Sequence, residues 1–457
     1  MQGGKAFSVF VVLSYLQLTS PKLYSPFCFF LIGLESSMCP PQFISKLLEM
    51  ASRAIFDPAN CFKHPLLPLR QESAKSSTTR RISDYIEIIP IEGKGLGTVA
   101  TRDIEAFTLL YTESPAGIAI EKPRQPHITI SSIAEACRKM APDIRARFDA
   151  LHEGSRPFQT REMRIWKTNC FGWDPVENRN GFSAIFLNIS LINHSCLPNA
   201  EYQQNFKEGR MELYSTQSIR AGQEVTISYG SKFQYMVASE RKAYLRRVYG
   251  FTCKCPACAD GPTSRMSDQR RRLLKKTHYC GIMGQPAAPN FSAVYNINTP
   301  NSIEPITLVE EQGFADGMQI LRPGTAGLLR REVKLMYDEG FTGSKLLDCM
   351  FTQAMTSLVV MHKRMTDQRS RAPLDPHSEI ARCVQLMQAS ELLLRQMTPA
   401  SDPKMRKMSQ AKDNCNQMWN VAIPEPMTVA QCKEIIPRIM SEEPDPLAET
   451  IWSSRLF

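Results

Sequence analysis

The sequence predicts an α+β protein, in which small β-sheets over residues 84–260 are followed by an α-helical C-terminal domain over residues 261–457. Two observations predict the sheets. Apolar and β-branched residues alternate on both sides of the glycine-rich turn GKGLG, and they alternate again in MELYSTQSI and EVTISYG. One observation predicts the helical domain: apolar residues, many of them Met and Leu, recur at helical spacing after residue 324.

Residues 1–83 precede these patterns and form a poorly defined N-terminal extension. Its apolar run at residues 6–18 is shorter than the roughly 18 to 20 residues that span a bilayer, so we expect no firm membrane association. A signal peptide is an alternative interpretation of this run. The whole chain of 457 residues carries a net charge of +10, which suits an acidic partner but does not decide among functions.

Local signals define the elements of the first domain. The strand FTLLYTESP ends at Pro115, and residues 131–153 favour a helix that breaks near Pro142. Ser132 and Glu135 have the spacing of a capping box. The strands MELYSTQSI and EVTISYG are joined by the turn RAGQE, and a further helix begins at Ser239.

Helical periodicity in the C-terminal domain covers residues 324–368, 378–397 and 403–421, with prolines as breaks. The basic run RMSDQRRRLLKKTH lies before these segments. We expect this run to be a solvated linker, and a nuclear signal or a nucleic-acid contact is the alternative.

Three cysteines, Cys253, Cys255 and Cys258, have a C-x-C-x2-C spacing that lets three thiolates converge on one ion. A structural zinc ion takes four ligands in a tetrahedron, so a fourth ligand must come from elsewhere in the chain. The remaining eleven cysteines are scattered singly, unlike the dense pairing of a secreted disulfide scaffold. Three buried or disulfide-bonded cysteines without a metal are the alternative.

The segment INHSCLPNA, Ile192 to Ala200, places several polar side chains in a row between apolar flanks. Polar groups inside a folded domain need hydrogen-bond partners, so this segment is a candidate functional site.

The order GKGLG, INHSCLPNA, EVTISYG and C-x-C-x2-C resembles that of the SET-domain protein lysine methyltransferases, over about residues 84–258. The resemblance implies a SET-domain fold of small sheets with a knot-like topology, and a zinc-binding post-SET module. It also implies that Cys196 is the fourth zinc ligand. The cofactor implied is S-adenosylmethionine, with a structural Zn²⁺ ion.

Further site residues follow from the resemblance one at a time. Asn193 and His194 would line the S-adenosylmethionine pocket, and Tyr229 matches the catalytic tyrosine. Phe251 matches an aromatic residue that packs on adenine, and Asn169 matches a polar contact of the SET and MYND-domain branch. The backbone of the glycine-rich turn would hold the methionine end of the cofactor through Lys94, Gly95 and Leu96.

The chain departs from the family pattern at several places. Phe107 stands where the family usually has a glycine. The MYND finger is absent, as in the SET-only relatives of that branch. Ile227 lies two residues before Tyr229, where an aromatic residue often influences the number of methyl groups added, so the degree of methylation is open.

We therefore expect a protein-lysine N-methyltransferase that acts on a histone or another protein, in chromatin of the nucleus or in the cytoplasm. Contact with nucleic acid would be indirect at most. The first alternative is a non-catalytic SET module that acts as a scaffold. The second is a zinc-finger protein that binds nucleic acid, for which the cysteines lack a second ligand set and a recognition helix.

Overall fold

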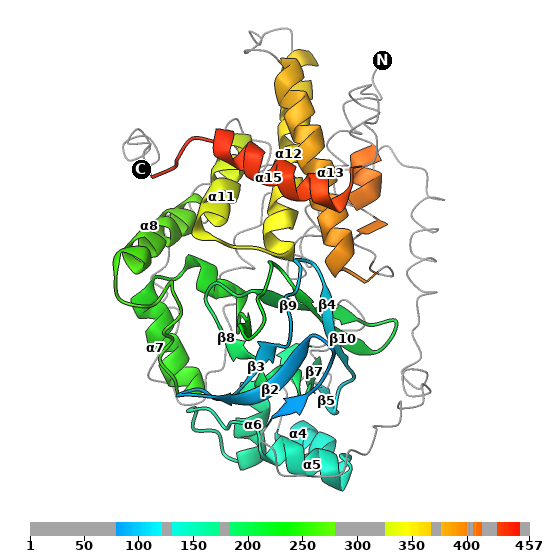
Figure 1. The fold of residues 1–457 in the computed structure, drawn as a ribbon, viewed down its shortest axis with the longest axis vertical. Helices are drawn as coiled ribbons and strands as arrows, with labels where there is room; N and C mark the ends of the chain where they lie inside the picture. The colour runs from blue at the N-terminus through cyan, green and yellow to red at the C-terminus, as the bar shows by residue number, and fades with distance from the viewer. Residues whose placement is uncertain are drawn as a thin grey trace, which may run out of the picture.

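The computed structural model describes residues 79–120, 130–172, 182–278, 325–366, 376–399, 402, 405–406, 408–413 and 427–447. Three small sheets and short helices make up the lower part of the molecule in Figure 1, and longer helices make up the upper part. The predicted α+β class and the small sheets of the SET-domain fold are confirmed. The predicted N-terminal extension lies, except for residues 79–83, outside the described residues.

The first sheet has the strand order β1-β2-β3-β11-β8. Its hairpin of β2 and β3 turns through Gly93, whose φ of 70° is in the left-handed region that glycine tolerates. The predicted strand–turn–strand around GKGLG is therefore confirmed. The strands are β1 Arg80–Arg81, β2 Ile86–Ile91, β3 Gly95–Ala100, β8 Asn193–His194 and β11 Glu224–Ile227.

Strands β8 and β11 run parallel, with Asn193 opposite Thr226 and His194 opposite Ile227. The side chain of Asn199 extends this pairing beyond β8. Its Oδ1 accepts the Thr226 N–H at 2.8 Å, and its Nδ2 donates to the Glu224 carbonyl at 2.9 Å. An amide side chain thus takes the place of a backbone partner, which explains why an asparagine closes the LPN turn.

Two three-stranded sheets have the orders β4-β10-β9 and β5-β7-β6. Their strands are β4 Leu109–Glu113, β5 Gly117–Ile120, β6 Phe171–Gly172, β7 Phe182–Ile185, β9 Ala200–Asn205 and β10 Arg210–Ser215. Apolar side chains of all three sheets, among them Ile86, Leu213 and Ala184, form one buried core.

The first helices are α4 Ile130–Arg138, α5 Pro142–Asp149, α6 Arg161–Asn169 and α7 Ala238–Tyr249. The predicted break at Pro142 is confirmed, because α5 begins there. The predicted capping box is wrong, because α4 begins at Ile130 and Ser132 lies inside the helix.

The basic run is not a solvated linker, and this prediction is wrong. Residues of the run form helix α8, Pro262–Lys276, and its residues Ser267, Arg271 and Leu274 are buried. Arg271 faces inward because three side-chain nitrogens of its guanidinium find acceptors in the protein. A count of positive charges in the sequence does not show which of them is paired.

The C-terminal helices are α11 Thr325–Glu339, α12 Ser344–Thr366, α13 Pro376–Met397 and α15 Val429–Glu442. The segment predicted as one helix over residues 324–368 is split between Gly340 and Gly343, whose φ values are 87° and 88°. Within the segment predicted at 403–421, the described residues 405–406 and 408–413 are helical.

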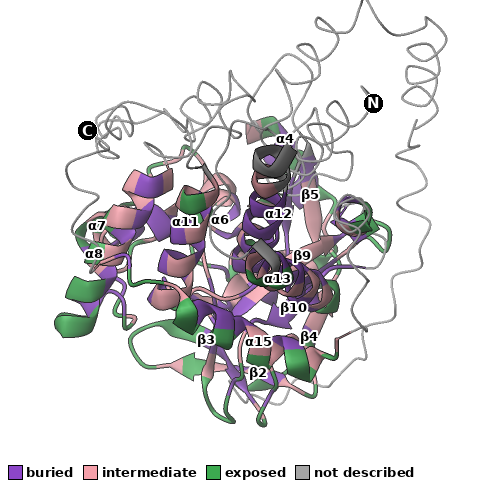
Figure 2. Ribbon diagram, turned by 90° about the horizontal axis from the view of Figure 1, so that it is seen from above, coloured by how far each residue is buried: buried purple, intermediate pink, exposed green. Residues whose placement is uncertain are grey.

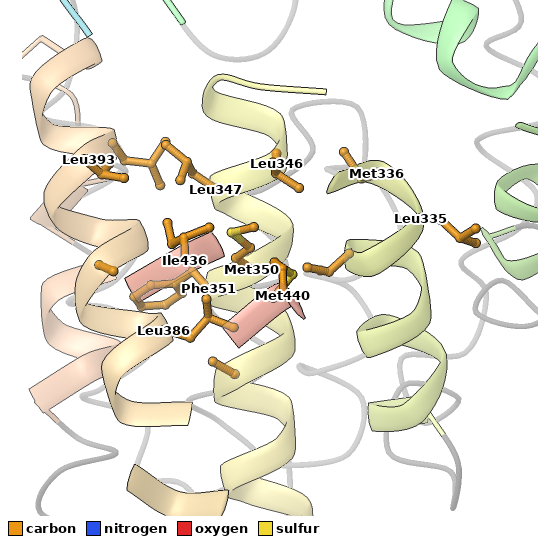
Figure 3. Close-up of a cluster of buried hydrophobic side chains, with 14 of the residues drawn as sticks. Leu335, Met336, Leu346, Leu347, Met350, Phe351, Leu386, Leu393, Ile436 and Met440 are labelled. Atoms are coloured by element: carbon orange, nitrogen blue, oxygen red, sulfur yellow. The ribbon is translucent and has the colours of Figure 1, made fainter. Parts of the chain in front are cut away.

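The core of these helices is rich in Met and Leu, as expected. Figure 3 shows Met350, Phe351, Leu386, Ile436 and Met440 meeting between α12, α13 and α15. Buried residues also follow much of the length of α12 in Figure 2. No helix in the described ranges is long and apolar enough to cross a membrane.

The helices pack directly on the sheets, since one hydrophobic core contains Tyr214 of β10 as well as Met350 of α12. Glu201 of β9 caps the N-terminus of α12, and its carboxylate oxygens lie 3.1 and 3.0 Å from the Ser344 N–H. The division of the chain at residue 260 stays a prediction.

Phe107 is, among the described residues, the non-glycine residue with a positive φ, at 69°. Its N–H donates to the Ser215 carbonyl at 2.9 Å, and its ring packs against the main helical core. The backbone therefore adopts here the conformation for which the family's usual glycine is suited, although the side chain is large.

We expect Phe107→Gly to be more stable than Phe107→Ala by about 1 kcal/mol, because both variants lose the ring but only alanine retains the left-handed strain. Urea unfolding of the two variants measures this difference in the free energy of unfolding. Equal stabilities would show that the backbone at this position is not strained.

Candidate active site and metal centre

Four cysteine sulfurs meet at one point in the structure. Cys196 follows β8, and Cys253, Cys255 and Cys258 follow α7; their sulfur atoms all lie within 4.8 Å of one another. The Sγ of Cys196 is 3.9 Å from that of Cys253 and 3.5 Å from that of Cys258. Sulfurs at the corners of a tetrahedron with Zn–S of about 2.3 Å are about 3.8 Å apart, so these side chains fit a metal ion.

The same cysteines form no disulfide, which sets aside the disulfide alternative for them. A disulfide has its sulfurs about 2.05 Å apart, far closer than the 3.9 and 3.5 Å that separate Cys196 from Cys253 and Cys258. Cys196, Cys253 and Cys258 are buried, and Cys255 is half-buried. Enclosure on most sides is typical of a structural metal site and not of an open catalytic one.

His194 connects the cysteine cluster with the segment that carries Tyr229. The Nδ1 atom of His194 accepts the Tyr229 N–H at 3.1 Å, and Nε2 lies 3.3 Å from the Cys196 sulfur. Burial lowers the pKa of His194 to about 4, so the ring is neutral at physiological pH. Since Nδ1 is an acceptor, the proton is on Nε2 and points toward the sulfur.

Asn193 lies beside the glycine-rich turn, as the predicted cofactor pocket requires. Its Nδ2 donates to the Leu96 carbonyl at 3.3 Å and to Glu224 Oε1 at 2.9 Å. Two acceptors on one side fix the orientation of the amide. Its Oδ1 has no donor within the described part of the chain and is open to a ligand.

Glu224 and Gly97 are two further residues beside Asn193 that the sequence analysis missed. Glu224 forms an ion pair with Lys94 as well as its hydrogen bond to Asn193. A Cβ atom on Gly97 would lie 2.5 Å from Asn193 Nδ2 and 2.3 Å from the Ile91 side chain. Only the pairing of β3 with β11 brings Glu224 here, and no local pattern signals it.

Tyr229 is half-buried and lies in a group of aromatic rings. Its ring centroid is 5.2 Å from that of His194, 4.9 Å from that of Tyr249 and 6.3 Å from that of Phe251. Tyr249 was not predicted, although it lies only two residues before Phe251. The aromatic rings of Tyr229, Tyr249 and Phe251 thus form an apolar group beside His194.

The Tyr229 hydroxyl donates to the Ile192 carbonyl at 2.9 Å. Desolvation raises the pKa of Tyr229, and the Glu224 charge raises it further. The side chain is therefore a neutral phenol, whose oxygen keeps lone pairs for weak contacts from a ligand.

Asn169, at the end of α6, has its amide engaged with the local backbone. Its Nδ2 donates to the carbonyls of His152 and Ile165, both at 2.7 Å. This geometry gives it a structural role in joining α6 to the preceding loop, whereas its predicted contact with the cofactor stays a prediction.

Comparisons with known proteins identify the domain that carries most of these residues. Residues 95–230 match the family profile of the SET domain. The chain is 23% identical over 198 residues to the histone-lysine N-methyltransferase set5 of Schizosaccharomyces pombe. The aligned region covers 42% of this chain and 56% of set5. It is 42% identical over 76 residues to the human protein-lysine N-methyltransferase SMYD4, covering 17% of this chain and 9% of that protein.

A third relative is the human N-lysine methyltransferase SMYD2, 32% identical over 109 residues, with 23% of this chain and 24% of that protein covered. The match spans about half the length of set5 and much less of the two human proteins. The chain carries a SET domain, and it resembles the SET-domain lysine methyltransferases of the SET and MYND-domain branch.

Proposed function

We propose that the protein is an S-adenosylmethionine-dependent protein-lysine N-methyltransferase with a structural zinc ion. The single observation that carries the proposal is the parallel pairing of β8 with β11. In support, Asn193, the glycine-rich turn and Tyr229 lie around one short stretch of sheet, and His194 there contacts Cys196 of the four-cysteine cluster.

Lys94, Gly95, Leu96 and Asn193 would hold the amino-acid end of the cofactor. The open Oδ1 of Asn193 suits an ammonium group, because its Nδ2 already donates to the protein. Lys94 offers a cation for the carboxylate, at present shared with Glu224. Phe251 would pack on the adenine. Bound S-adenosylmethionine supplies a methyl group on a positively charged sulfur, which is open to attack by a nucleophile.

The side chains around Tyr229 would align the target lysine. Only the neutral amine has a lone pair for the attack, and the free amine has a pKa near 10.4. An apolar wall of Tyr229, Tyr249 and Phe251 favours the neutral amine by desolvation. The neutral Tyr229 hydroxyl orients the amine and accepts weak C–H···O contacts from the methyl group.

Cys196, Cys253, Cys255 and Cys258 would hold the zinc ion. Its role is structural: it ties the segment after α7 to the segment after β8, which brings Phe251 near Tyr229. Thiolate ligands persist in reducing compartments, so the proposal places the protein in the nucleus or the cytoplasm.

A histone or another protein with an accessible lysine is the proposed substrate. The named activities of set5 and SMYD4 support this substrate class. A non-catalytic scaffold that retains the fold and the zinc ion is the second candidate. The neutral hydroxyl of Tyr229 and the open Asn193 Oδ1 favour the enzyme, since a scaffold requires neither.

Metal analysis of the purified protein should find one zinc ion per chain, and Cys196→Ser should lose it. Structural zinc contributes roughly 10 to 16 kcal/mol of apparent binding free energy in small peptides, so the segment after α7 should then lose order. Cys137→Ser, a buried cysteine of α4, is the matched control and should retain zinc. Full zinc content in Cys196→Ser would refute the ligand assignment.

Asn193→Ala should weaken binding of S-adenosylmethionine about tenfold or more, because a hydrogen bond to a charged group contributes about 1.5 to 3 kcal/mol. Gly97→Ala should act in the same direction by displacing the Asn193 amide. Gly172→Ala, where the added Cβ meets nothing within 4 Å, should bind like the parent protein. Calorimetry measures the three affinities, and unchanged binding by Asn193→Ala would remove this residue from the pocket.

Tyr229→Phe should retain fold, zinc and cofactor affinity but lose methyl transfer, because the hydroxyl acts mainly in the transition state. The parent is first incubated with labelled S-adenosylmethionine, a panel of histones and cell extract to find a substrate. Single-turnover rates are then compared for the parent, Tyr229→Phe and the control Tyr85→Phe. A parent that binds cofactor yet methylates nothing favours the scaffold, and a fully active Tyr229→Phe excludes the hydroxyl from catalysis.

A further inference from the structure

Two fully buried arginines lie beside the four-cysteine cluster. Arg241 of α7 contacts Cys258, and Arg271 of α8 contacts Cys196. We propose that these two side chains retain the metal ion, and that α11 of the C-terminal domain contributes to this retention by fixing Arg271 through Glu339. The inference rests on the metal site proposed above and concerns residues outside the ligand set.

Arg241 contacts the cluster directly. Its Nε lies 3.4 Å from the Cys258 sulfur. The other two guanidinium nitrogens donate to the carbonyls of Met236 and Ala257, which fixes the plane of the group. A positive N–H donor aimed at a thiolate forms a charge-assisted hydrogen bond, which stabilises the charged form of the sulfur.

Arg271 holds the backbone of the fourth cysteine. It donates to the Cys196 carbonyl at 3.0 Å and to the Phe233 carbonyl at 2.6 Å. Its Nε forms an ion pair at 2.8 Å with the carboxylate of Glu339, the last residue of α11. The centroid of the Phe341 ring lies 4.9 Å from the guanidinium carbon. The position of Cys196 is thus linked to a residue far along the chain in the C-terminal helices.

The charges of the site explain why cations are needed there. Four thiolates and one Zn²⁺ ion carry a net charge of −2, and a buried charge is costly unless it is compensated. Arg241 and Arg271 supply two positive charges within the same enclosure. Glu339 offsets one of them, and Arg270, 3.7 Å from Glu339, adds a further cation at the edge.

The test uses the full-length protein loaded with zinc and mixed with an excess of the chelator 4-(2-pyridylazo)resorcinol, whose absorbance follows metal release. Arg241→Met removes the charge and the contact with sulfur. Arg246→Met is its matched control, because Arg246 is exposed on the same helix and bonds only the Thr252 hydroxyl among its described side-chain contacts. Circular dichroism first establishes that each variant is folded. If Arg241→Met does not fold, Arg241→Lys is used in its place, with Arg246→Lys as its control.

A second pair tests the hold of Arg271 on the backbone of Cys196. Arg271→Lys keeps the charge but loses the fork of donors to the Cys196 and Phe233 carbonyls. Arg270→Lys is the control, because it changes the neighbouring residue, which faces the same Glu339. Substitution of groups that support metal ligands typically lowers metal affinity 10- to 100-fold.

We expect zinc release to be about 10- to 100-fold faster in Arg241→Met and Arg271→Lys, and close to the parent rate in both controls. Parent-like release in Arg241→Met and Arg271→Lys would overturn the role of the arginines and leave the metal site intact. A parent protein that contains no zinc would instead overturn the metal site itself, and this inference with it.

Discussion

The parallel contact between β8 and β11 is the constraint on which the rest of the site depends. It involves two residues of β8, and the backbone continues it when the Ser195 N–H donates to the Ile227 carbonyl at 3.0 Å. Asn193 lies on the side of the proposed cofactor pocket and Cys196 on the side of the four-cysteine cluster. Because so few residues separate the two, a shift of β8 by one position would displace both sites at once.

The C-terminal helices are joined to this contact through β9, which continues the chain after β8 and makes hydrogen bonds to α12. Ala200 and Glu201 begin β9 directly after the LPN turn, and Glu201 caps α12. The Thr216 and Thr342 hydroxyls form a second polar link at 2.8 Å. Polar links of this kind fix orientation, whereas the shared apolar core provides most of the stabilisation.

The sequence predicted those parts of the protein that local chemistry determines. The GKGLG hairpin requires glycine conformations, the C-x-C-x2-C spacing brings three sulfurs together, and Pro142 breaks a helix. The position of Cys196 beside them could be named only through resemblance to a family, since 57 residues separate it from Cys253. Glu224, Gly97 and Arg271 could not be found, because strand pairing and tertiary packing give these residues their roles.

The burial of Arg271 also changes what the basic run can do. A receptor that reads a cluster of lysines and arginines as an extended peptide requires consecutive side chains on one accessible strand. In α8 the run is wound into a helix, and Arg271 and Leu274 point into the protein while Arg272 is exposed. Binding of the run to such a receptor as an extended peptide would require α8 to unwind, and Arg271 would lose its hydrogen bond to the Cys196 carbonyl. In the folded protein, a partner therefore meets a helical surface with interrupted charge and not a linear basic peptide.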